Sequence, residues 1–411
     1  MNPLFTELKT VRGLDSGPLC PHVRAYIAQL QEQGYQLRTI REHRCLFANL
    51  NRWLTRTDRS LRDLNEKLVE RFLQRRLRSR KKLAGERPTL HRLLSILRKA
   101  GVTPPPKAIP TTPAQRLAAD YRRYLSEERG CSDWTLENYG RIIDRFVIER
   151  FGTGSLKPSR LQARDIVKFV QRNAHLHSRG HTLQVVTALR SFLRFMHYRG
   201  HITSDLAHAV PVVAHWRMAN LPKHLPAEAV QKVLASCDQT TAVGRRNYAI
   251  LLLLARLGLR AGEIIALQLE DIDWENAQLT VRSKKGRGWA RLPLPKDVGK
   301  AMARYLQIDR PHCSCRNVFV RMVAPYERLS NSPVISVLVR NALKNAGVES
   351  VRKGAHIFRH SLATEMLRQG ASLDEIGQVL RHKDPDTTAI YAKVDLDALR
   401  RLAVAWPGGV Q

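Results

Sequence analysis

The sequence predicts a mainly α-helical protein of several domains, with one small antiparallel β-sheet in its last domain. Apolar residues recur every three or four positions over long stretches, as in Val23, Ile27 and Leu30, which is typical of helices with one buried face. Two strand-like segments joined by a glycine-containing basic turn occur between Ile272 and Leu294, a pattern that indicates a hairpin. With 411 residues, the chain is too long for one compact core.

The charge of the chain indicates its partner. The formal net charge is +33, from 69 Lys and Arg against 36 Asp and Glu. An electrostatic field of this sign and size favours a polyanion, and double-stranded DNA or another nucleic acid is the expected partner. A protein that is basic only for solubility is the alternative.

Membrane attachment and secretion are not expected. The chain has no basic amphipathic anchor or lipidation motif, and residues 1–10 do not resemble a secretion signal. The apolar stretch from Ala249 to Ala255 is too short to span a bilayer. The six cysteines do not form a disulfide-like framework, so a cytoplasmic protein with reduced thiols is predicted.

The first predicted domain, residues 1–105, is helical from Val23 to Arg76. This helical stretch ends in a dense run of basic residues. Such a run can be a solvated face or a linker, but in so basic a chain contact with DNA phosphates is the better interpretation. The predicted DNA-backbone contacts in this run are Arg75, Arg76, Arg78, Arg80, Lys81 and Lys82.

Residues 112–210 form the second predicted domain and repeat the pattern of the first. The matching pairs, 95 to 97 residues apart, are Tyr26 with Tyr121, Leu30 with Leu125, Gly34 with Gly130, Thr39 with Thr135, Leu64 with Leu161, Phe72 with Phe169 and Gln74 with Gln171. Thr89-Leu90 and Thr182-Leu183 match at a looser spacing. Duplication of a helical domain is predicted, and a coincidence of helical periodicities is the alternative. A proline-rich linker should join the two domains at residues 103–113.

The third predicted domain covers residues 222–405. A helix should begin at Pro226, and the nearly all-apolar stretch from Arg246 to Leu257 should be a buried helix. The first strand, the basic turn and the second strand are expected at residues 272–281, 283–288 and 290–294. The remainder is predicted to be helical up to about Val404.

Six polar residues of this domain occur in contexts that favour phosphate chemistry. They are Arg260 in Gly-Leu-Arg-Ala-Gly-Glu, Lys285 in a Lys-Gly turn, His356 and Arg359 in His-x-x-Arg, His382 in Leu-Arg-His, and Tyr391. His356 and Arg359 share a helix face. Arginine binds phosphate oxygens through a planar charged fork, and a tyrosine can form a covalent ester as a nucleophile. Each residue taken alone has an ordinary explanation, such as a surface ion pair or a packed aromatic ring.

Over roughly residues 225–400 this set resembles the tyrosine recombinase (phage integrase) family, and residues 112–210 look like the helical core-binding domain of that family. The resemblance implies a C-shaped, multidomain clamp around double-stranded DNA. It also implies site-specific recombination or integration through a 3′-phosphotyrosyl intermediate, in a protein of a mobile element. The partners implied are further copies of the chain, as a tetramer on DNA, or related recombinase subunits, at the nucleoid.

The resemblance assigns a role to each of the six residues. Arg260 and Arg359 would neutralise the non-bridging phosphate oxygens, as strand transfer requires. His356 and His382 would hydrogen-bond the phosphate and transfer protons, and Tyr391 would attack the phosphorus. No cofactor is implied, neither a metal ion nor ATP, because the phosphotyrosyl ester retains the energy of the cleaved bond.

Further residues are assigned supporting roles. Lys285, at a turn, suits a general acid that protonates the 5′ oxygen, although Lys284 or Arg287 could take its place or contact the DNA backbone. Glu263 is expected to orient Arg260 through a carboxylate pair. His360 is expected to be packed or adjacent to DNA, without a catalytic role.

The chain departs from the family pattern in two places. Ala261-Gly262 replaces a bulkier residue and a small polar one, which affects local contacts only. Residues 1–105 exceed a two-domain layout, and they could be an arm-type DNA-binding domain, a second clamp or a protein-contact module. A helix at residues 396–404 should dock on a neighbouring protomer. The alternatives for function are a type IB topoisomerase and a non-catalytic DNA-binding accessory protein.

Overall fold

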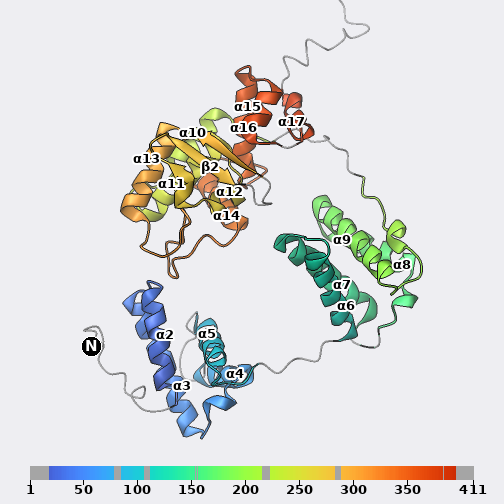
Figure 1. Ribbon diagram of the computed structural model, residues 1–411, viewed down its shortest axis with the longest axis vertical. Coiled ribbons are helices and arrows are strands. Elements are labelled where there is room, and N and C mark those ends of the chain that lie inside the picture. Colours follow the sequence, from blue (N-terminus) through green and yellow to red (C-terminus); the bar gives the residue numbers. More distant parts are fainter. Residues whose placement is uncertain are drawn as a thin grey trace, which may run out of the picture. The chain divides into compact units, whose positions relative to one another are not determined.

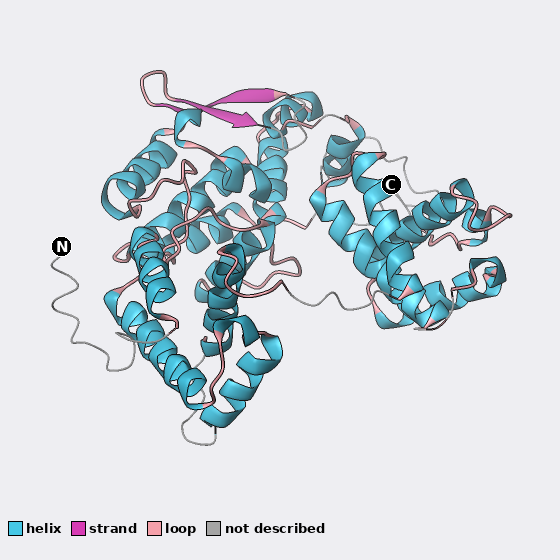
Figure 2. Ribbon diagram, turned by 60° about the horizontal axis from the view of Figure 1, so that its bottom comes forward, coloured by secondary structure: helices cyan, strands magenta, loops and turns pink. Residues whose placement is uncertain are grey.

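The computed structural model describes residues 18–77, 85–105, 112–152, 154, 156–214, 223–282, 288–382 and 384–394. Most of these residues lie in helices, and the strands among them form one three-stranded antiparallel sheet, as Figure 2 shows. The predicted fold class, mainly helical with a small antiparallel sheet, is confirmed. No helix in these ranges is both long enough and apolar enough to cross a membrane.

Residues 18–105 contain four helices around a hydrophobic core of their own, drawn in blue and cyan in Figure 1. The elements are α2 (Cys20–Glu32), α3 (Leu37–Arg56), η1 (Leu61–Asp63), α4 (Glu66–Leu77) and α5 (Glu86–Lys99). Tyr26 and Phe47 pack edge to face in this core, with ring centroids 4.9 Å apart. We call these residues the first bundle.

Residues 112–210 contain a second set of four helices with a separate core, which we call the second bundle. It belongs to a compact unit of the chain, Pro105–Arg217. The elements are α6 (Pro113–Glu127), α7 (Asp133–Phe151), η2 (Pro158–Arg160), α8 (Ala163–Leu176), α9 (Arg179–Tyr198) and η3 (Leu206–Ala209). Side chains that favour helix starts begin three of these helices: Thr112, Ser132 and Ser178 each accept a backbone N–H in the first turn.

The two bundles share one order of elements and one set of helix pairings. In each, the first helix packs on the second and the fourth, and the fourth also packs on the second and the third. The first helix is followed in each by a glycine with positive φ, 77° at Gly34 and 54° at Gly130, a conformation that glycine adopts at little cost.

The ends of the fourth helices correspond at a spacing of 99 residues. Gly101 and Gly200 both have a positive φ. The next backbone N–H bonds back to the helix in the same way in both, from Val102 to the Leu97 carbonyl and from His201 to the Met196 carbonyl. The starts of the fourth helices are 93 residues apart, which is the spacing of Thr89 and Thr182, because α9 is six residues longer than α5.

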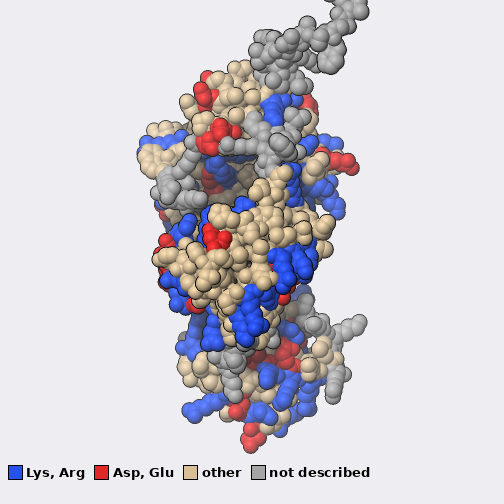
Figure 3. Space-filling model, turned by 90° about the vertical axis from the view of Figure 1, so that its right-hand side faces the viewer, with Lys and Arg blue, Asp and Glu red and all other residues tan. Residues whose placement is uncertain are grey.

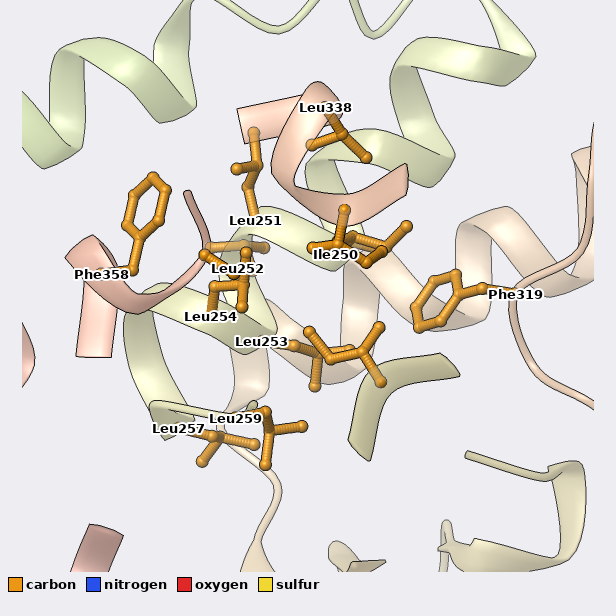
Figure 4. Close-up of a cluster of buried hydrophobic side chains, with 14 of the residues drawn as sticks. Ile250, Leu251, Leu252, Leu253, Leu254, Leu257, Leu259, Phe319, Leu338 and Phe358 are labelled. Atoms are coloured by element: carbon orange, nitrogen blue, oxygen red, sulfur yellow. The ribbon is translucent and has the colours of Figure 1, made fainter. Parts of the chain in front are cut away.

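The remaining described residues, 223–394, fold around α11 (Ala242–Leu257). Its side chains from Ala249 to Leu254 are all buried, as predicted. Figure 4 shows those from Ile250 to Leu254 with Phe319, Leu338 and Phe358 in one apolar cluster. Burial of each large aliphatic side chain contributes about 1.5–3 kcal/mol, so α11 is the central support of this region. The other helices are α10 (Ala227–Ala235), α12 (Ala261–Ala266), η4 (Leu269–Asp271), α13 (Lys296–Arg304), η5 (Tyr305–Asp309), α14 (Ser332–Asn345), α15 (His356–Arg368), α16 (Leu373–Leu380), α17 (Asp386–Ala389) and η6 (Ile390–Val394).

The sheet has one strand more than predicted. Its strands are β1 (Ile272–Asp273), β2 (Gln278–Arg282) and β3 (Trp289–Pro293), in the order β1-β2-β3. The prediction of a single strand over residues 272–281 was wrong, because a tight turn divides this stretch. Asp273 accepts hydrogen bonds from the backbone and side-chain amides of Asn276, and Ala277 has a φ of 50°. The predicted β2–β3 hairpin is confirmed.

The prediction of continuous helix after the sheet was also wrong. Residues 310–331 are irregular and contain isolated bridges, such as the one between Val320 and Arg328. Phe319 and Val320 are nevertheless fully buried, so their apolar character reflects burial of a loop in the core. The predicted helix at residues 396–404 lies outside the described residues.

Candidate active site

The end of α11 positions the first predicted site residue. The helix ends at Gly258, whose φ of 56° turns the chain back. A Cβ at this position would come within 2.8 Å of Leu380 Cδ2, so glycine is favoured both by the conformation and by the close packing. Two residues later Arg260 forms the N-cap of α12, and its side chain is 40% exposed.

Glu263, in the first turn of α12, connects two arginines. Its carboxylate accepts hydrogen bonds from the Arg260 backbone N–H and from Arg260 Nη1, both at 2.9 Å, and from Arg381 Nη2 at 3.1 Å. Burial alone would raise the pKa of Glu263, but the backbone hydrogen bond and the two positive charges lower it. The carboxylate is therefore ionised at neutral pH.

Arg359 lies on the inner side of α15 and is only 4% exposed. Its guanidinium donates to the Gly258 carbonyl at 2.5 Å and to the Leu380 carbonyl. Burial and the nearby charges of Arg260 and Arg381 lower its pKa to about 9, which leaves it protonated at neutral pH. The ends of α11 and α16 thus hold a buried cation.

The two predicted histidines lie at the surface of the site. His356 is the first residue of α15 and is exposed. His382 follows α16, and its Nδ1 lies 2.7 Å from Thr388 Oγ1. Partial burial and the charges of Arg359 and Arg260 lower the pKa of both rings, to about 4 for His382. His382 is therefore neutral at pH 7 and has one ring nitrogen available as a hydrogen-bond acceptor.

Tyr391 lies beneath these residues in η6 and is 1% exposed. Its hydroxyl is 2.8 Å from Nδ1 of His360, and its ring is parallel to that of His382, with centroids 6.5 Å apart. Burial raises the pKa of Tyr391 to about 12, although the charge of Arg359 opposes this. A phenol in this environment is protonated and is a poor nucleophile.

A cleft of about 830 Å³ opens above the buried tyrosine. Its lining includes three of the six predicted site residues, Arg260, His356 and His382, together with Glu263 and Arg381. Arg359 and Tyr391 lie below this surface. The structure therefore brings five predicted residues into one neighbourhood, although they are spread over about 130 residues of sequence.

The sixth residue, Lys285, lies outside the described residues, as do Lys284 and Arg287. Paired strands flank them in the sequence, because β2 ends at Arg282 and β3 begins at Trp289. Gly288 and Trp289 line the cleft, so the hairpin reaches the site.

The predicted basic run is described in part. Arg75 and Arg76 lie at the end of α4, and Arg76 forms an ion pair of 2.9 Å with Glu86. The other predicted DNA-backbone contacts, Arg78, Arg80, Lys81 and Lys82, lie outside the described residues.

Several contacts of the site were not foreseen from the sequence. His360 was expected to be packed or adjacent to DNA, without a catalytic role, and in the structure it bonds to the tyrosine hydroxyl. Its position one turn after His356 was the available signal. Arg381 was not singled out, although it stands beside His382. Within the described part of the chain, no three His, Cys, Asp or Glu side chains are grouped so that they could hold a metal ion.

Comparison with known proteins identifies the family. The model of the phage integrase family matches residues 223–397. The protein y4rA of Sinorhizobium fredii, which bears the name of an integrase/recombinase, is 42% identical over 397 residues, covering 96% of each chain. The chain belongs to the phage integrase family of tyrosine recombinases. The tyrosine recombinase XerD of Listeria monocytogenes serotype 4b is 29% identical over 68% of this chain and 94% of its own.

A solved member shares the fold of this tyrosine recombinase. The structure of XerH site-specific recombinase bound to palindromic difH substrate, in a post-cleavage complex, matches with a TM-score of 0.56. The match covers 84% of this chain and 99% of that one, at 18% sequence identity. At this identity the likeness establishes the fold.

Proposed function

We propose that the chain is a site-specific DNA recombinase that cuts and rejoins strands through a 3′-phosphotyrosyl intermediate. The observation that carries the proposal is the position of Tyr391. Its ring is parallel to that of His382, which lines the cleft together with Arg260 and His356, and the charge of Arg359 is near enough to act on its pKa. Phosphoryl transfer requires a nucleophile, stabilisation of negative charge and groups that accept or donate protons, and a tyrosine, two arginines and two neutral imidazoles can supply these.

The proposed first step forms one bond and breaks one bond. Tyr391 Oη attacks the scissile phosphorus and gives up its proton to a neutral imidazole, for which His356 and His382 are the candidates. Arg260 and Arg359 stabilise the charge on the non-bridging oxygens. The bond from phosphorus to the 5′ oxygen breaks, and that oxygen takes a proton from Lys285, which we retain as the proposed general acid.

The second step is the reverse reaction with a different strand. A 5′-hydroxyl attacks the phosphotyrosyl ester, a new phosphodiester forms, and the Tyr391 hydroxyl is restored. Because the ester conserves the energy of the cleaved bond, we propose that the reaction needs neither ATP nor a metal ion.

We also propose the assembly and setting of the reaction. The three proposed domains, residues 1–105, 112–210 and 222–405, would hold duplex DNA as a clamp, with a tetramer or related recombinase subunits pairing two sites. A mobile element is the proposed origin of the gene, and the cytoplasm, at the nucleoid, is the proposed location of the protein. Direct or inverted repeats beside the coding sequence would support this origin, and their absence from every occurrence of the gene would contradict it.

The direct test is the recovery of covalent protein–DNA adducts. Wild-type protein is incubated with fragmented DNA from the locus that encodes it and washed in denaturant, and the attached fragments are sequenced. The wild type should retain fragments that share one sequence, attached at a 3′ end, whereas Tyr391→Phe should bind DNA and retain none. A stable adduct of Tyr391→Phe, or the lack of any wild-type adduct, would overturn the proposal. Wild-type adducts whose DNA fragments share no sequence, together with relaxation of supercoiled DNA, would indicate a topoisomerase.

A further inference from the structure

The first bundle carries a basic hollow that no step of the proposed reaction uses. It lies between α3 and α4 and measures about 220 Å³. We call it the α3–α4 hollow, and its lining residues are Asn49, Arg52, Trp53, Arg56, Phe72, Arg75 and Arg76. The half-buried Trp53 packs against Phe72, with ring centroids 5.5 Å apart, and gives the hollow an apolar wall.

Three of its four arginines have no compensating acid. Arg52, Arg56 and Arg75 are exposed, and no ion pair joins any of them to a carboxylate in the described ranges. Arg52 bonds only to neutral groups, Asn49 Oδ1 at 2.8 Å and the Ala48 carbonyl. The neighbouring acid, Glu86, is already paired with Arg76. Like charges that converge on one hollow repel one another, and an anion bound there would relieve the repulsion.

The second bundle shows the same place with less unpaired positive charge. Core residues of α3 and α7 correspond at a spacing of 96 and those of α4 and α8 at 97, so Glu149 stands where the first bundle has Trp53, and Arg172 where it has Arg75. Glu149 and Arg172 form an ion pair of 3.1 Å. Ile148 and Gly152 replace Arg52 and Arg56. In place of Asn49 the second bundle has Arg145, which bonds to the neutral side chain of Asn173. One arginine without an acid therefore remains there, against three in the first bundle, so most of the unpaired charge belongs to the first bundle.

The extent of the charge favours a long polyanion over a small one. Arg41, Arg52 and Arg56 lie on one exposed face of α3, over about 22 Å at 1.5 Å per residue. Directly after Arg76 the sequence adds four more Lys and Arg and no acid before Gly85. Figure 3 shows one face of the molecule, where Lys and Arg, in blue, cover more surface than Asp and Glu.

We propose that the α3–α4 hollow binds the phosphate backbone of duplex DNA, so that the first bundle makes a contact with DNA of its own. Arg52, Arg56 and Arg75 supply the charge, and the Trp53 wall limits the water around their forks. The contact is independent of base sequence, because it reads phosphates only. It rests on the proposed function, in that DNA is taken as the substrate.

The test is the salt dependence of binding by the full chain. A labelled mixed-sequence duplex is titrated by fluorescence anisotropy at several salt concentrations, with the triple variant Arg52→Gln, Arg56→Gln and Arg75→Gln. Each phosphate neutralised contributes about −0.9 to the slope of log affinity against log salt. The slope should therefore become shallower by about 2.7 if each arginine neutralises one phosphate.

A control with the same loss of charge separates the hollow from the general field. Arg24, Arg62 and Lys99 are exposed residues elsewhere on the first bundle, and their replacement by glutamine should leave the slope almost unchanged. An unchanged slope in the hollow variant, or an equal change in both variants, would overturn the proposal. Adduct formation by the wild type is measured in the same preparations, so a failure of the hollow and a failure of the proposed function remain distinguishable.

The second bundle suggests a sharper variant. Trp53→Glu places beside Arg75 the acid that the second bundle has beside Arg172, and it should make the slope shallower by about one phosphate, or about 0.9. Trp53→Gln loses the same ring without adding charge and is the matched comparison. Equal slopes for the two variants would contradict a role for the free charge of Arg75. Because the three arginines are exposed, the triple variant decides the question even if the Trp53 variants fail to fold.

Discussion

At the scale of single residues, the proposed nucleophile is protected. The Tyr391 hydroxyl lies in the core and bonds to His360. Burial, with the nearby charges of His356 and Arg352, lowers the pKa of His360 to about 4, and burial raises that of Tyr391 to about 12. Both groups are neutral at pH 7. Cleavage therefore requires that this hydrogen bond open and that the tyrosine approach the cations of the cleft.

Arg260→Ala should slow cleavage without preventing binding. Loss of a preorganised donor to the developing charge costs on the order of 3 kcal/mol, or more than 100-fold in rate, whereas affinity depends on many other phosphate contacts. Single-turnover adduct formation measures the rate. Arg256→Ala is the control. Arg256 lies four residues before Arg260, is exposed and forms an ion pair with Asp297. A wild-type rate for Arg260→Ala would place the site elsewhere.

The neutral histidines predict a loss of stability in acid. The pKa of His360 and of His382 is lowered to about 4 in the folded protein, against about 6.5 in an unfolded chain. As pH falls from about 6.5 to 4, the unfolded state binds protons that the folded state does not, so the free energy of unfolding decreases. Above this window these two groups do not change it.

Urea unfolding across pH 4 to 8 measures this effect. His360→Gln should make the stability curve shallower between pH 4 and 6.5, and His175→Gln, at an exposed position, should leave it unchanged. A curve for His360→Gln that runs parallel to that of the wild type would contradict the assigned protonation state.

At the scale of elements, the site is assembled where helices end. The C-terminal ends of α11 and α16 and the start of α12 meet at Gly258, Arg381 and Arg260, and Glu263 joins the two arginines. Arg381 has a φ of 57°, a left-handed conformation that is costly for any residue with a Cβ. The same residue, Arg381, therefore combines a strained backbone with a side-chain contact to the carboxylate of Glu263.

Substitution of Arg381 by two small residues should separate these effects. Arg381→Ala and Arg381→Gly both lose the contact with Glu263, but only glycine removes the backbone strain. Arg381→Gly should therefore be more stable than Arg381→Ala by about 1 kcal/mol, as measured by urea unfolding. Equal stabilities would show that the left-handed conformation is not kept in solution.

The helices and strands of this region could be predicted from the sequence better than the contacts between them. Apolar spacing located α11 and the hairpin, because these signals are local. Glu263 and Arg381 are 118 residues apart, and His360 and Tyr391 are 31 apart, so no local pattern reports their contact. The irregular residues 310–331 were mistaken for helix because a buried loop and a buried helix need the same apolar side chains.

At the scale of the whole molecule, two stretches of the chain form helical bundles with the same helix pairings. The cores of the two bundles do not share residues. Tyr26 and Tyr121, and likewise Phe72 and Phe169, are buried at equivalent places. The duplication inferred from spacing stays a prediction, to which the shared helix pairings add support. The surface charge of the α3–α4 hollow could be understood only from three-dimensional neighbours.

Separate cores predict separate unfolding. Phe72→Ala and Phe169→Ala should each cost about 3–5 kcal/mol of local stability, from lost burial and the cavity left behind. Hydrogen exchange should accelerate in residues 18–105 for the first variant and in residues 112–210 for the second. Faster exchange in both bundles from either variant would mean that they unfold as one cooperative unit.

The contacts of Arg359 also decide which residue can occupy its position. A guanidinium has five N–H groups on three nitrogens; one on each terminal nitrogen is committed to the carbonyl of Gly258 or Leu380, and three remain for a ligand. A lysine concentrates its donors on one atom at the end of a flexible stem, and it cannot reach two carbonyls on separate helices and an anion at the same time. Under the proposed function, chain architecture and catalysis would thus draw on different atoms of one side chain, and this division of atoms favours arginine over lysine there.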